Sequence, residues 1–188
     1  MAQSRVVKTL GISGSLRKGS FNTATLRAAA ELLPDGMTLD LAEIGDLPLY
    51  NDDVRLAGYP PSAQRFREQI AAADALLFAT PEYNYSMSGV LKNAIDWASR
   101  PPDPPVIGKP AAVMGAATGM SGTIRAQYDL RRSFVFLNMF PVNKPEVLIT
   151  QAAGKFDAQG KLTDQPTRDL IAQLLVALRD WTLRLYPR

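Results

Sequence analysis

The chain has 188 residues, 46% of them hydrophobic and 21% charged, which predicts one well-packed globular domain spanning residues 1–188. It contains no cysteine and no histidine, which excludes disulfides, thiolate nucleophiles, Ser-His-Asp triads and the usual zinc sites. The formal net charge is only +3 and the Lys and Arg residues are scattered, so we expect no nucleic-acid partner.

The first part of the chain predicts a strand, a helix and a second strand. Residues 5–12 form a run rich in Val, Leu and Ile that passes into Gly and Ser residues, as expected for a buried strand followed by a loop. Residues 22–33 are rich in Ala and Leu, which predicts a helix, and the alternation over residues 37–44 predicts a half-buried strand. The region around residues 48–53 is typical of a loop.

The remainder continues the alternation of helices and strands. Helices are predicted over residues 61–73, 89–99, 122–139 and 163–186, and strands over residues 74–80, 111–117 and 142–150. The proline-dense residues 101–105 cannot continue a helix. Five strands that alternate with five helices predict an α/β fold with a parallel sheet and helices on both faces.

Two loops are expected to carry the function. In doubly wound sheets the ligand lies beyond the carboxyl ends of the strands, at the point where the strand order reverses. For the strand order 2-1-3-4-5 this point lies between the first and third strands. The loops that follow these strands are residues 13–22 and 81–88.

The first loop, S-G-S-L-R-K-G-S-F-N, is suited to binding an anion. The hydroxyls of Ser15 and Ser20, the Arg17 cation and the free amides of a helix start can converge on a phosphate. The loop lacks the G-x-G-x-x-G fingerprint, and Ser20 stands where a P-loop requires lysine, so a terminal monophosphate fits best. The alternative is a tight turn that only caps the helix.

The second loop, P-E-Y-N-Y-S, exposes Tyr83 and Tyr85 on either side of Asn84. Aromatic side chains in this position are suited to a planar ligand such as an isoalloxazine ring, with the backbone amides of residues 82–85 at its pyrimidine edge. A flavin would also supply the reactivity that a chain without Cys and His lacks. The alternative is that the tyrosines pack against a neighbouring subunit or cover the end of the sheet.

Four stretches carry a specific resemblance: G-S-L-R-K-G-S-F-N, T-P-E-Y-N-Y-S, G-V-L-K-N-A-I-D-W and R-A-Q-Y-D-L-R, which begin at residues 14, 80, 89 and 125. With them the chain resembles the NADPH-dependent FMN reductase family, and most closely its bacterial chromate/quinone reductase branch. The resemblance implies a flavodoxin-like three-layer sandwich with a five-stranded parallel sheet in the order 2-1-3-4-5.

The resemblance also implies a tightly bound FMN. By motif position, its phosphate would be bound by the first loop and its ring by the second. A third loop usually offers Ser or Thr, but here Ala117 can contribute only its backbone. The implied FMN-binding residues are Ser15, Leu16, Arg17, Lys18, Gly19, Ser20, Phe21, Asn22, Pro81, Glu82, Tyr83, Asn84, Tyr85, Ala117, Thr118 and Gly119.

Members of the family form homodimers and homotetramers, in which an R-x-x-Y pair on the fourth helix approaches the site of another subunit. Arg125, Tyr128 and Glu146 occupy the matching positions and, with Tyr85, are predicted acceptor-site or interface residues. No catalytic side chain and no metal is predicted, because the flavin carries the chemistry. The alternative for these residues is an ordinary solvent-exposed helix face.

These patterns predict an FMN-dependent oxidoreductase that uses NADPH or NADH to reduce quinones, by a ping-pong transfer of hydride and electrons. Chromate, azo and nitro compounds and ferric chelates are further expected acceptors. One alternative is a flavodoxin-type electron carrier that does not use NAD(P)H; such carriers are acidic, whereas this chain is slightly basic. A flavin-free interaction protein with the same fold is another.

The sequence favours the cytoplasm. No stretch approaches the roughly 20 apolar residues that a membrane span requires. The N-terminal residues M-A-Q-S-R-V-V-K lack the apolar core of a signal peptide.

Overall fold

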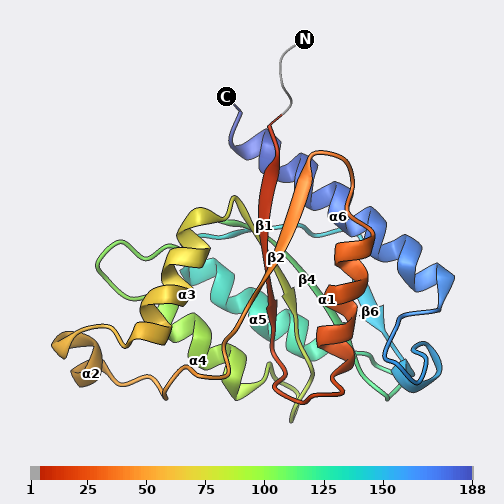
Figure 1. The fold of residues 1–188 in the computed structure, drawn as a ribbon, viewed down its shortest axis with the longest axis horizontal. Helices are drawn as coiled ribbons and strands as arrows, with labels where there is room; N and C mark the ends of the chain where they lie inside the picture. The colour runs from red at the N-terminus through yellow and green to blue at the C-terminus, as the bar shows by residue number, and fades with distance from the viewer. Residues whose placement is uncertain (1–4, 188) are drawn as a thin grey trace.

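The computed structural model describes residues 5–187, so residues 1–4 and Arg188 of the predicted domain lie outside the described part. Strands and helices follow one another along the chain (Figure 1). The strands are β1 (Val7–Ser13), β2 (Met37–Ala42), β3 (Ala75–Ala79), β4 (Pro110–Ala116), β5 (Phe140–Pro141) and β6 (Val147–Ile149). The helices are α1 (Phe21–Glu31), α2 (Asp52–Ala57), α3 (Pro61–Ala72), α4 (Gly89–Ala98), α5 (Ile124–Phe136) and α6 (Gln165–Leu185), with a short 3-10 helix at Ala152–Gly154.

The sheet is parallel and has the order β2-β1-β3-β4-β5, which confirms the predicted order. The predicted fifth strand over residues 142–150 is wrong in detail, because two short strands share that edge. β5 pairs with the start of β4 at Pro110 and Ala111, and β6 pairs with its last three residues. Pro145, which has no N–H to donate, lies in the segment between them.

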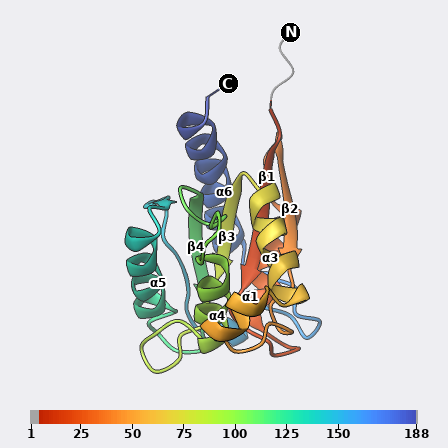
Figure 2. The ribbon, with the colours of Figure 1, turned by 90° about the vertical axis from the view of Figure 1, so that its left-hand side faces the viewer.

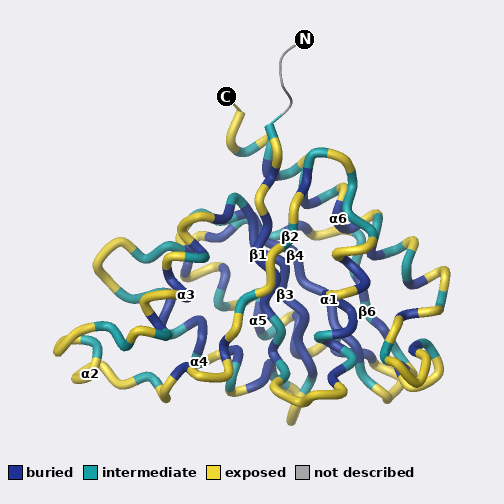
Figure 3. The backbone as a smooth tube through the Cα atoms, in the orientation of Figure 1, coloured by how far each residue is buried: buried dark blue, intermediate teal, exposed yellow. Residues whose placement is uncertain are grey.

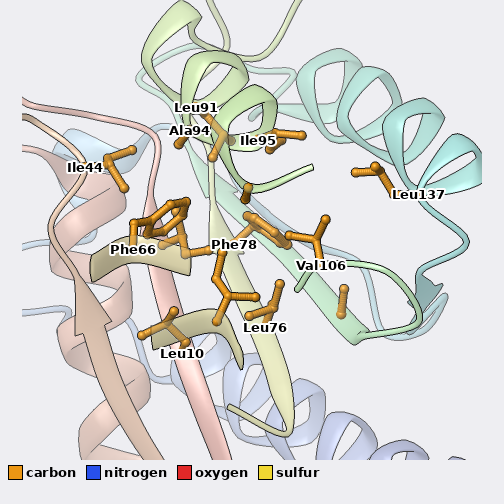
Figure 4. Packing of buried hydrophobic residues seen from close by; sticks show 14 of the residues in the cluster. Leu10, Ile44, Phe66, Leu76, Phe78, Leu91, Ala94, Ile95, Val106 and Leu137 are labelled. Carbon is orange, nitrogen blue, oxygen red and sulfur yellow. The ribbon is translucent and has the colours of Figure 1, made fainter. Parts of the chain in front are cut away.

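Helices cover both faces of the sheet, and two hydrophobic cores result. One core joins the sheet to α3, α4 and α5, which face the viewer in Figure 2, and the other joins it to α1 and α6. Figure 3 shows that the strands between these layers are mostly buried. In the first core Phe78 of β3 lies 5.5 Å from Phe134 of α5, measured between ring centroids, and it packs among Leu76, Phe66 and Val106 (Figure 4).

Helix α2 begins inside the predicted loop over residues 48–53, so this prediction is wrong for Asp52 and Asp53, and the helix over residues 54–57 was not predicted. Asn51 caps the helix by accepting a hydrogen bond from the amide of Asp53, at 2.9 Å, and Arg55 forms an ion pair with Asp52. None of the six helical residues is buried. A helix without an apolar face has no hydrophobic period, so its capping and charge pattern is its only signal in the sequence.

No helix within residues 5–187 is long and apolar enough to cross a membrane.

Candidate functional site

Three loops leave the carboxyl edge of the sheet side by side. Backbone hydrogen bonds extend the strand ladder one residue into each of them: Gly14 N–H to Ala79 O, at 2.8 Å, Thr80 N–H to Met114 O, at 3.1 Å, and Ala117 N–H to Ile149 O, at 3.0 Å. The loops after β1 and β3 meet at the lower end of the molecule in Figure 1. These loops start from a common edge at the switch point, as the sequence predicts.

A cleft of about 440 Å³ lies between the three loops. Its lining combines residues from Ser15 to Thr118, which are 103 positions apart in the sequence, and most of the lining residues belong to the predicted binding set. The lining residues are Ser15, Arg17, Ser20, Phe21, Asn22, Pro81, Glu82, Tyr83, Ala116, Ala117 and Thr118.

The first loop turns donors toward this cleft at the start of α1. Ser20 is the N-cap of the helix, and its Oγ accepts a hydrogen bond from the amide of Thr23, at 3.2 Å. The amides of Phe21 and Asn22 make none of the hydrogen bonds found among residues 5–187. The Arg17 guanidinium lies 5.6 Å from the centroid of the Phe21 ring. Free amides, the positive end of a helix dipole and a cation together fit a phosphate group.

The side chain of Asn22 has a structural role that the sequence did not indicate. Its side chain is 4% exposed, its Nδ2 donates to Ala116 O at 3.0 Å, and its Oδ1 accepts from Ala116 N–H at 2.9 Å. Both ends of the amide are therefore engaged with the last residue of β4. The side chain of Asn22 joins the start of α1 to the end of β4, while its backbone amide makes none of the hydrogen bonds described for the chain.

The second loop is a tight turn in an unusual backbone conformation. Tyr83 and Ser86 exchange two backbone hydrogen bonds of 3.0 Å, and the two residues between them, Asn84 and Tyr85, have φ angles of 51° and 66°. This is the geometry of a type I′ turn. The Ser86 hydroxyl donates to Asp129 on α5, which holds the turn against that helix. Tyr83 and Tyr85 are 53% and 71% exposed, so the turn presents one aromatic residue, Tyr83, to the cleft and a second, Tyr85, beside it.

Glu82 links the second loop to α5 through its carboxylate. One oxygen accepts from the amides of Arg125, at 2.9 Å, and Ala126, at 3.2 Å, and the other accepts from Arg125 Nε, at 2.8 Å. Thr123, the N-cap residue of α5, makes no side-chain cap, so Glu82 satisfies the free amides of the helix start in its place. The Arg125 guanidinium also lies 4.0 Å from the centroid of the Tyr85 ring.

The third loop is held closely to the sheet. The Ala117 amide is bonded to Ile149, and Ala117 O accepts from Ala152 N–H at 3.0 Å, so its backbone N–H is not free for a ligand. The amides of Thr118 and Gly119 make none of the backbone hydrogen bonds described for the chain. At Gly115 an added Cβ would lie 2.0 Å from Thr123 Oγ1, which explains the glycine at the end of β4.

The remaining predicted residues lie away from this lining. Leu16, Asn84, Tyr85 and Gly119 are exposed beside it, and Lys18 and Gly19 line a neighbouring cleft.

Tyr128 and Glu146 form their own contact, with Tyr128 Oη donating to Glu146 Oε1 at 3.3 Å. The hydrogen bond from Lys144, at 2.9 Å, lowers the pKa of Glu146. Neither residue lines the cleft.

The groups of the cleft fit FMN. Hydroxyls, amides and a cation at one end match a terminal monophosphate, while Pro81, Tyr83 and Ala116 offer apolar walls for a planar ring. A 2-1-3-4-5 parallel sheet with such a cradle at its switch point defines a flavodoxin-like nucleotide-binding protein.

Comparison with known proteins leads to the same class of protein. The model of the NADPH-dependent FMN reductase family matches residues 7–154, and the chain belongs to this family. The predicted family and fold are thereby confirmed.

Two relatives cover nearly the whole chain. An NAD(P)H-dependent FMN reductase of Pseudomonas aeruginosa is 63% identical over 179 residues, which are 95% of this chain and 97% of the relative. An NAD(P)H:quinone oxidoreductase of Solanum tuberosum is 47% identical over 191 aligned positions, covering 98% and 97%. Among solved structures, the flavoenzyme FerB, an NAD(P)H:(acceptor) oxidoreductase of Paracoccus denitrificans, superposes with a TM-score of 0.87 at 37% identity, covering 95% of this chain and 98% of FerB.

Proposed function

We propose that the protein is an FMN-dependent oxidoreductase that uses NAD(P)H to reduce quinones and related small acceptors. The observation that carries the proposal is the meeting, in one cleft, of phosphate-type donors from the first loop and the exposed aromatic residue Tyr83 from the second. Family membership and the relatives, an FMN reductase and a quinone oxidoreductase, support the same activity.

The phosphate of FMN would be bound by Ser15, Arg17 and the free amides of Phe21 and Asn22. At the other end, the amides of Glu82 and of the Tyr83–Ser86 turn would meet the polar edge of the ring. The amides of Glu82, Asn84 and Tyr85 make none of the backbone hydrogen bonds described for the chain, so they are available for this purpose. FMN supplies, when bound, the hydride and electron chemistry that the side chains lack.

The residues around the ring would act by orientation. The second loop is tied to α5 by Glu82 and Asp129, so its amides are fixed before a ligand arrives. Tyr85 and Arg125 stack in an exposed position beside this loop and would form one side of the acceptor pocket. A pocket open to solvent fits a broad range of acceptors, among which we include chromate, azo and nitro compounds and ferric chelates.

We further propose a homodimer or homotetramer that acts in the cytoplasm, where NAD(P)H is regenerated. The support for assembly is a group of large exposed side chains on α5: Val135 and Phe136, which are 83% and 84% exposed, and Tyr128, which is 57% exposed. In such an assembly Arg125, Tyr128 and Glu146 would approach the site of a second subunit. Size-exclusion chromatography with light scattering tests this part, and a monomer would contradict it.

The activity is tested by the visible spectrum of FMN-reconstituted protein without oxygen, before and after one equivalent of NADPH. We expect rapid loss of the flavin absorbance and its return when benzoquinone is added. A bound flavin whose absorbance is unchanged by both NADPH and NADH would contradict the proposal and indicate an electron carrier. Failure to bind FMN would refute both functions.

A further inference from the structure

A second cleft of about 240 Å³ adjoins the first at the start of α1, and Ser20 and Phe21 line both of them. Its opposite wall is the turn of residues 157–160, in the loop between β6 and α6 that lies beside α1 in Figure 1. The ring centroids of Phe21 and Phe156 lie 5.1 Å apart, which packs this turn against the helix start. The second cleft is therefore a continuation of the proposed cofactor site and is built from a different part of the chain.

Three cations at the two adjoining clefts make no ion pair within residues 5–187. Lys18 and Arg27 line the second cleft, and Arg17 lines the first. None of the three takes part in the ion pairs found among residues 5–187, and their side chains make none of the hydrogen bonds found there. Like charges that gather in one place repel one another, and a bound phosphate relieves that repulsion.

One carboxylate, that of Asp157, also lines the second cleft. Its Oδ1 accepts from the amides of Gln159, at 3.0 Å, and Lys161, at 2.8 Å, and this fixes the turn. Its Oδ2 has no partner among the hydrogen bonds of the described residues. Two cations can bind a phosphate, and a carboxylate in the same cleft can accept a hydrogen bond from a hydroxyl group. This combination matches a sugar that carries both a phosphate and a free hydroxyl group.

We propose that the second cleft binds the phosphorylated ribose of NADPH, with Lys18 and Arg27 at its 2′-phosphate and Asp157 at its 3′-hydroxyl. This inference rests on the proposed function, which makes NAD(P)H the co-substrate. The cleft is below the usual size of a site for an entire ligand, so it receives one end of a dinucleotide whose other end lies over the first cleft. It thus gives the enzyme a preference for NADPH over NADH.

The test uses FMN-loaded protein and calorimetric titration with 2′,5′-ADP and with 5′-AMP, which lacks the 2′-phosphate. We expect 2′,5′-ADP to bind about tenfold more tightly than 5′-AMP, because charge-assisted hydrogen bonds to the extra phosphate are lost with 5′-AMP. Arg27→Ala should remove most of this difference, and Arg27→Lys should restore part of it. Lys8→Ala is the matched control, since Lys8 is an exposed cation that lines neither cleft.

Kinetics with a quinone supply a second measurement. Arg27→Ala should raise the KM for NADPH by about tenfold and change the KM for NADH far less. Equal affinity of the unaltered protein for 2′,5′-ADP and 5′-AMP would overturn the inference. An equal loss of affinity for 2′,5′-ADP in Arg27→Ala and Lys8→Ala would overturn it as well. Inorganic phosphate that binds as tightly as 2′,5′-ADP would indicate a simple anion site and overturn the assignment to ribose. Absence of FMN binding, or of NADH oxidation, would instead refute the proposed function.

Discussion

Replacing Asn22 by alanine removes two buried hydrogen bonds that join the start of α1 to the end of β4. The N–H and C=O of Ala116, which is 4% exposed, both lose their side-chain partner. A buried polar group left without a partner costs about 1–3 kcal/mol, so the two together predict a loss of about 3 kcal/mol in the free energy of unfolding. For a chain of this length 1 kcal/mol shifts the Tm by about 2–4 °C, which predicts a Tm lower by roughly 6–12 °C.

The assay is urea unfolding of the flavin-free protein, because a phosphate-binding side chain would affect only the FMN-loaded form. Ser15→Ala is the control: the Ser15 hydroxyl accepts only a long hydrogen bond of 3.5 Å from the Arg17 amide, so stability should change by less than about 0.5 kcal/mol while FMN binding weakens. A flavin-free Asn22→Ala protein as stable as the unaltered one would refute the reasoning. The side chain of Asn22 would then not be a clamp between α1 and β4.

Three further predictions concern the capping and turn residues. Asp164 caps α6 by accepting from the Thr167 amide at 3.1 Å, and its hydrogen bond from the Thr167 side chain lowers its pKa below the ordinary 3.8. Because the folded-state pKa is the lower one, this stabilisation is present above about pH 4 and is lost as the pH falls through the folded-state value. Asp164→Ala should therefore lower the free energy of unfolding by about 1 kcal/mol at pH 7, measured by urea unfolding. A stability difference between the variant and the unaltered protein that stays constant down to pH 2 would contradict this. Glu82→Gln removes the charge that binds Arg125, so we expect the free energy of unfolding to fall by about 1–2 kcal/mol and the KM for quinone to rise. Unchanged stability and KM would contradict the role of Glu82 in joining the second loop to α5. Asn84 has a φ of 51°, which valine adopts poorly and glycine adopts readily. Asn84→Val should therefore lower the free energy of unfolding by about 1–2 kcal/mol, while Asn84→Gly should change it little. Equal effects of the two substitutions would show that the turn changes its backbone conformation and would contradict this prediction.

Much of the fold could be predicted because its signals are local. The unalternating apolar run that became β3 and the Ala- and Leu-rich segment that became α1 are visible in the sequence, as is the change to Gly and Ser after β1. Alternation of these elements then leaves few arrangements of the sheet. The loops beyond β1 and β3 follow from that arrangement, and the structure brings them to a common cleft.

The contacts that fix the loops could not be predicted. Asn22 and Ala116 are 94 positions apart, and Glu82 and Arg125 are 43 apart, so no local pattern indicates their pairing. A carboxylate that caps a distant helix is indistinguishable in the sequence from a solvent-exposed Glu.

The break in the fifth strand has a similar origin. A short apolar segment gives no sign that its two ends pair with different parts of β4. Such features depend on where the packed sheet places each backbone group.

The most direct test of the central claim is calorimetric titration of the flavin-free protein with FMN and with riboflavin, which lacks the phosphate. A phosphate cradle built by Arg17, Ser15 and the start of α1 predicts one FMN bound per chain and riboflavin binding weaker by about 100-fold, as expected when two or more charge-assisted hydrogen bonds are lost. Equal affinity for FMN and riboflavin, or no binding of FMN, would contradict the claim.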